Sequence, residues 1–160
     1  MITPILILLI LSSPLGVAFF YSRLKKASIN IKKYACWGLG LAFIFFFIGH
    51  IVKANGMAEM LPPWVPFKIP LIYITGAIEL LVGIALFITR LQLVAAKISI
   101  IIFIVFFPAN IYAALNSVGL GGHQWGPIYL LIRAPLQIIL ILWAYFLCIK
   151  NHNKSLKQDK

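Results

Sequence analysis

The nineteen residues from Leu71 to Thr89 form an apolar run with a single charged side chain, the carboxylate of Glu79. As a helix this run would be roughly 28 Å long, close to the thickness of the hydrocarbon core of a bilayer. A carboxylate at its centre is costly unless it meets a partner, and Gly76 and Gly83 on the same face would let a second helix approach. The sequence therefore predicts a transmembrane helix that directs Glu79 into a helical bundle.

The sequence contains four further apolar runs. Of all its residues, 62% are hydrophobic and only 11% are charged. Soluble domains are about half apolar and about one quarter charged, so this composition excludes an ordinary soluble fold. We predict an all-α polytopic membrane helix bundle with five spans, over residues 2–21, 34–52, 71–89, 91–115 and 128–149. A signal peptide is the alternative for the first run, but no basic residues precede it, which favours an uncleaved span.

Basic residues predict the orientation of the five spans. The first loop, the third loop and the C-terminal tail together hold ten Lys and Arg residues, whereas the second and fourth loops hold only Lys53 and Lys68. Short cytoplasmic loops carry the excess of Lys and Arg, so we expect a multi-pass membrane protein with its N-terminus outside and its C-terminus in the cytoplasm. The net charge of +11 follows from this topology, and nucleic acid is not an expected partner.

The connection from Lys53 to Pro70 contains four prolines, which argue against a regular helix there. Within it, Pro63, Trp64 and Pro66 predict a rigid lid over the outer mouth of the bundle. Proline fixes φ and removes a hydrogen-bond donor, and tryptophan prefers the membrane interface.

Five polar side chains fall between the middle and the outer end of their predicted spans. Glu79 lies near the middle, and the others lie farther out, namely His50, Asn110, Arg133 and Gln137. We expect them to line one polar pocket with aromatic walls. Arg133 is the expected partner of Glu79, because it stays charged and can bind a carboxylate through two hydrogen bonds. The structural alternatives are a buried pair that only fixes helix register, an interfacial histidine, and an asparagine that satisfies carbonyls freed by Pro108.

The histidines and cysteines predict neither a metal site nor a disulfide. His50, His123 and His152 are scattered along the sequence, while Cys36 and Cys148 fall at cytoplasmic span ends, where thiols stay reduced. The sequence contains no CxxC motif, and we find no haem-binding histidine pair and no flavin loop. No cofactor therefore follows from motifs alone.

Several short motifs together resemble the DoxX-like family of small bacterial membrane proteins. They are Gly76-x-x-Glu79, Phe107-Pro108-Ala109-Asn110-Ile111 and Arg133-x-Pro135-Leu136-Gln137, supported by Gly49-His50, Pro63-Trp64 and Trp143. The resemblance covers residues from about 34 to 149 and implies a four-helix membrane domain over residues 34–149. Residues 1–22 would then form one extra N-terminal transmembrane helix, and residues 150–160 a basic cytoplasmic tail.

The resemblance also implies a function, because DoxX relatives include a subunit of a thiosulfate:quinone oxidoreductase. We expect a membrane subunit or assembly partner of a redox or respiratory complex, and not a self-sufficient enzyme. In the inner membrane of a bacterium, the outer pocket would receive a quinone headgroup or a small apolar ligand. A soluble redox protein or another membrane subunit would supply the electrons. The alternative is a protein that binds or transports lipids or small molecules through the same pocket.

Overall fold

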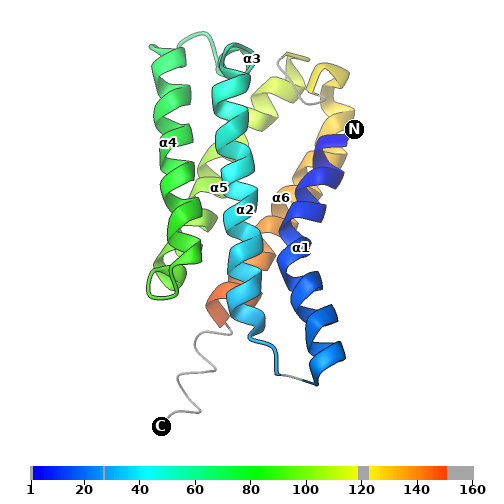
Figure 1. Ribbon diagram of the computed structural model, residues 1–160. Helices are drawn as coiled ribbons and strands as arrows, with labels where there is room; N and C mark the ends of the chain where they lie inside the picture. The colour runs from blue at the N-terminus through cyan, green and yellow to red at the C-terminus, as the bar shows by residue number, and fades with distance from the viewer. Residues whose placement is uncertain (1, 27, 119–122, 151–160) are drawn as a thin grey trace.

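The computed structural model describes residues 2–26, 28–118 and 123–150, and over these residues the fold is all-α (Figure 1). This confirms the fold class predicted from the sequence. The elements in chain order are α1 (Ile2–Lys25), α2 (Ile31–Val52), α3 (Ala54–Glu59), α4 (Lys68–Phe87), α5 (Gln92–Leu115), the 3₁₀ segment η1 (His123–Tyr129), α6 (Leu130–Trp143) and the π-helical segment η2 (Ala144–Lys150).

Five helical segments are long and apolar enough to span a bilayer. They are α1, α2, α4, α5 and the stretch Trp125–Lys150, which runs from η1 through α6 to η2. Many large apolar side chains point outward along these segments, as expected where lipid takes the place of water. The chain is therefore a multi-pass membrane protein.

The connection between the second and third spans is more helical than predicted. It contains α3, and α4 already begins at Lys68, so that Pro70 lies inside a helix. Pro70 is tolerated because it falls in the first turn, where its missing N–H would have had no helical partner. Before this turn, Phe67 adopts a left-handed conformation with φ of 50° and directs the chain into α4.

Helix α2 is central to the packing and contacts α1, α3, α4 and η2. Its approach to α4 is closest where two glycines face each other. A Cβ on Gly40 would lie 3.0 Å from the Gly83 carbonyl oxygen, and a Cβ on Gly83 would lie 3.2 Å from the Gly40 carbonyl oxygen. Such close backbone contact is favoured in membranes, where van der Waals packing holds helices together. The glycine pair therefore sets how near α4 comes to α2.

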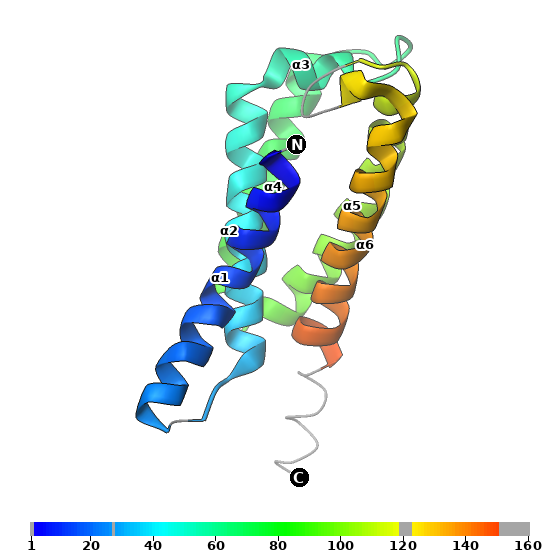
Figure 2. The same ribbon diagram turned by 90° about the vertical axis from the view of Figure 1, so that its right-hand side faces the viewer.

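Helix α1 packs on α2 from the side opposite to α4 (Figures 1 and 2). A Cβ on Gly38 would clash with the carbonyl of Leu11, so the two backbones touch at this point. From there to the Lys25 end of α1 the two helices diverge, as both views show.

The apolar core lies in the half of the bundle that holds the start of α2 and the end of the last span. Its buried members come from α1, α2, α4, α5, α6 and η2, and include Leu11, Leu39, Phe43, Leu86, Ala96, Leu140 and Cys148. Helices α5 and α6 lie side by side and face α1 and α2 across this core (Figure 2). Of the predicted polar residues, Gln137 borders this core, because it bonds the backbone of the core residue Phe103.

Candidate functional site

Glu79 on α4 and His50 on α2 form an ion-pair contact inside the bundle. Glu79 Oε2 lies 3.2 Å from His50 Nε2, and both side chains are buried. At the other ring nitrogen, His50 Nδ1 lies 2.8 Å from the Ile72 carbonyl oxygen and 3.4 Å from Thr75 Oγ1. Residues of α4 therefore contact the imidazole at both of its nitrogens.

Two features of α4 bring the carboxylate to the histidine. Helical side chains tilt toward the N-terminus, and the N-terminal end of α4 is the end that packs beside His50. One turn before Glu79, Gly76 leaves the space that the histidine occupies, because a Cβ on Gly76 would lie only 2.7 Å from His50 Cβ. The Gly-x-x-Glu spacing thus creates room for an imidazole next to a carboxylate.

The contacts of the imidazole determine its protonation. A backbone carbonyl only accepts hydrogen bonds, so His50 Nδ1 must donate to Ile72. Nε2 then faces a carboxylate oxygen, and these two acceptors would repel each other unless one of them carried a proton. One proton held by the pair, as imidazolium with carboxylate or as neutral imidazole with carboxylic acid, would remove that repulsion. Such a pair is suited to accepting and releasing a proton.

A second polar group joins α5 to α6. Arg133 Nη2 donates to Asn110 Oδ1 over 3.4 Å, and Asn110 Nδ2 donates to the Phe106 carbonyl over 3.2 Å. One turn after Arg133, Gln137 Nε2 donates to the Phe103 carbonyl. These bonds tie polar side chains of α6 to the backbone and side chains of α5.

The predicted pairing of Glu79 with Arg133 is wrong, because Glu79 contacts His50. Arg133 is near enough to interact electrostatically with Glu79, but within the described part of the chain no direct ion pair joins them. The order of helices explains this: α4 packs against α2 and α5, whereas α6 packs mainly against α5 and its own flanking segments. The five predicted residues thus form two neighbouring groups, one between α2 and α4 and one between α5 and α6.

Two polar atoms of these groups are buried without a hydrogen-bond partner, Glu79 Oε2 and Arg133 Nε. Glu79 Oε2 approaches His50 Nε2 to 3.2 Å, but the two atoms do not form a hydrogen bond. Buried polar groups are nearly always hydrogen-bonded, and an exception in a native structure requires an explanation such as a bound water or ligand. Glu79 Oε2 is a hydrogen-bond acceptor without a donor, and Arg133 Nε is a donor without an acceptor.

Tyr129 belongs to this region and was not among the predicted residues. It is only 2% exposed, and its side chain interacts with that of Arg133. Its spacing in the sequence could have indicated this contact. Tyr129 precedes Arg133 by four residues, and residues one helical turn apart lie on the same face of a helix.

The predicted lid residues Pro63, Trp64 and Pro66 are exposed, Trp64 to 80%. The segment just before them packs instead, since Ala54 and Ala58 of α3 cover Ile72 on α4. A lid formed by the proline-rich segment stays a prediction.

Across the described residues, no three His, Cys, Asp or Glu side chains come together as metal ligands would. Glu79 and His50 are two such groups, and their contact is with each other. His152 and the tail from residue 151 onward lie outside the described residues.

The fold and its buried polar groups define the class of protein: a multi-pass helical membrane bundle with ionisable side chains in its interior. Residues 39–148 match a family described as "Domain of unknown function (DUF8561)", and the chain belongs to this family. The match includes α4, α5, α6 and most of α2, with all five polar residues, and leaves α1 outside. No curated protein and no solved structure matches the chain.

Proposed function

We propose that this protein is the quinone-binding membrane subunit of a redox complex, with the polar groups around Glu79 and Arg133 as the headgroup site. The observation that carries the proposal is the His50–Glu79 contact, which places an imidazole against a carboxyl group inside an apolar bundle. The resemblance of the motifs to the DoxX-like family points to the same class of complex.

The chemistry of the residues present fits a quinone headgroup. Its oxygens accept hydrogen bonds as carbonyls and donate them as hydroxyls, and the site has a buried donor, Arg133 Nε, and a buried acceptor, Glu79 Oε2, without partners. Aromatic rings stand nearby, since Phe43, Phe46 and Phe103 pack together on α2 and α5. A bound quinone would supply two-electron, two-proton chemistry.

In this proposal each polar residue has a distinct role. Arg133 binds and orients the headgroup, with Asn110 and Tyr129 holding the guanidinium. Glu79 and His50 hold and move the proton, and the bond from His50 Nδ1 to Ile72 fixes the ring so that Nε2 faces the carboxylate. Electrons come from a partner subunit.

The proposal is tested by binding of a short-chain ubiquinone analogue to the full-length protein in detergent. We expect saturable binding that Arg133→Gln weakens about tenfold, the effect of losing one hydrogen bond from a charged donor. Glu79→Gln should weaken binding as well. Lys97→Gln is the matched control, because Lys97 is also a cation within a span but is exposed.

Failure to bind the analogue saturably, or equal binding by the wild type and both site variants, would contradict a quinone site. Retention of a phospholipid at Arg133 in place of the quinone would support the alternative class, a protein that binds or transports lipids.

A further inference from the structure

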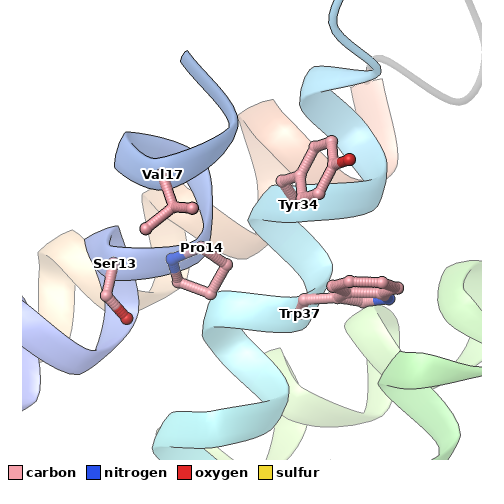
Figure 3. A pocket seen from close by; sticks show the side chains of 5 residues that line it. All are labelled: Ser13, Pro14, Val17, Tyr34 and Trp37. Atoms are coloured by element: carbon pink, nitrogen blue, oxygen red, sulfur yellow. The ribbon is translucent and has the colours of Figure 1, made fainter. Parts of the chain in front are cut away.

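A groove on the surface between α1 and α2 lies far from the polar groups described above. Its volume is about 230 Å³, and it is lined by Ser13, Pro14, Val17, Tyr34 and Trp37 (Figure 3). Pockets for whole drug-sized ligands are usually about 300–1,000 Å³, so this groove suits a segment of a chain-like molecule.

The divergence of α1 from α2 opens this groove. The helices touch at Leu11 and Gly38 and separate toward Lys25. Pro14 has no N–H for the Ile10 carbonyl, and the Ser13 hydroxyl donates to that carbonyl over 3.0 Å. The hydroxyl is thereby occupied within α1, so the wall of the groove remains essentially apolar.

A cluster of basic residues lies near the groove. The end of α1, the start of α2 and the loop between them carry Arg23, Lys25, Lys26, Lys32 and Lys33, and no acidic residue precedes Glu59 in the sequence. Lys33 links the charge to the groove, because its Nζ lies 4.9 Å from the centre of the Trp37 ring and 5.9 Å from that of Tyr34. The same two rings line the groove.

We propose that this groove is a binding site for an anionic phospholipid, with one acyl chain between α1 and α2 and the phosphate beside Lys33. The basic residues beside the groove complement the negative charge of a phosphate. The N-terminus of α2 adds the partial positive charge of the helix dipole, and its first turn contains no acidic side chain. Basic residues next to a transmembrane helix attract anionic lipids. An apolar groove that opens to the bilayer favours a lipid over a free anion, because the chain and the headgroup are then recognised together.

The test is native mass spectrometry of the full-length protein in detergent with added phosphatidylglycerol or phosphatidylcholine. We expect the wild type to retain phosphatidylglycerol preferentially. The variant Lys33→Gln should lose affinity for it about fivefold, because one basic residue near the membrane surface contributes about 1 kcal/mol of attraction to an anionic lipid. Val17→Trp should reduce retention by filling the groove, and Val17 is 70% exposed, so the larger side chain does not disturb the core.

The matched control is Lys53→Gln, which removes the same charge from an exposed position outside the groove. It should keep the preference for phosphatidylglycerol. Equal retention of the two lipids by the wild type, an equal loss in the control, or full retention by Val17→Trp would each overturn the proposal, since any of them would leave general charge attraction as the explanation.

Discussion

At the scale of single residues, the site depends on a missing side chain as much as on charged ones. His50 can reach Glu79 because Gly76 contributes no Cβ at the point where the imidazole crosses α4. Thr75 supports the same geometry, since its hydroxyl donates to the Leu71 and Ile72 carbonyls and stays beside the ring. The position of the imidazole is thus determined by α4 backbone and small side chains.

Replacing Gly76 by alanine should destabilise the protein by about 1–3 kcal/mol, the usual cost of inserting a methyl group into packed space. The added Cβ would lie 2.7 Å from His50 Cβ, so α2 or the imidazole must shift. The measurement is the thermal unfolding midpoint in detergent. Gly16→Ala is the control, because nothing lies within 4 Å of a Cβ there, and equal effects of the two changes would refute the close contact.

His50 and Glu79 should show a strong interaction in a double-mutant cycle. His50→Phe leaves a buried carboxylate without its contact, and Glu79→Leu leaves an imidazole without a charge partner, so each change alone should be costly. The double change should cost less than the sum, with a coupling energy of about 1–3 kcal/mol. Unfolding in detergent measures it, and additive effects would contradict the contact.

At the scale of helices, the sequence predicted the elements well but not which of them are neighbours. The lengths of the apolar runs and the basic residues between them predicted five spans. The Gly-x-x-Glu spacing correctly indicated that another helix comes close to α4. The partner of Glu79 could not be derived, because depth along a helix says nothing about helix order, and α5 lies between the helices of Glu79 and Arg133. Likewise, Asn110 bonds the Phe106 carbonyl and not the Ile104 carbonyl that Pro108 frees, a local choice that spacing does not determine.

The last span closes against the start of α2, and this contact is testable through the two cysteines. Cys36 and Cys148 are free thiols, both fully buried in the same core, and their side chains interact. Mild oxidation with diamide in detergent should therefore join them within one chain. The expected result is loss of both alkylatable thiols after denaturation.

Cys36→Ser serves as the control for this cross-link and should leave one thiol free to alkylate. Intermolecular dimers in place of the intrachain bond would contradict the contact between η2 and α2.

At the scale of the whole molecule, five spans place the two ends of the chain on opposite sides of the membrane. A reporter fused after Lys160 should be cytoplasmic, and one inserted at Gly121 should be outside, as the distribution of basic residues predicts. Both positions lie outside the described residues, so the experiment depends only on the number and order of the spans. Finding both reporters on the same side would contradict five spans.

The contact between α2 and the last span also bears on the order in which the protein can assemble during synthesis. Helices α1 and α2 are neighbours in sequence and can pack as soon as both have entered the membrane. In contrast, the carbonyl of Ala35 receives its hydrogen bond from Trp143 Nε1, more than a hundred residues later in the chain. Until the ribosome has delivered that last span, one face of α2 is open to lipid or to an insertion chaperone, and truncated translation products should be targets of membrane proteolysis.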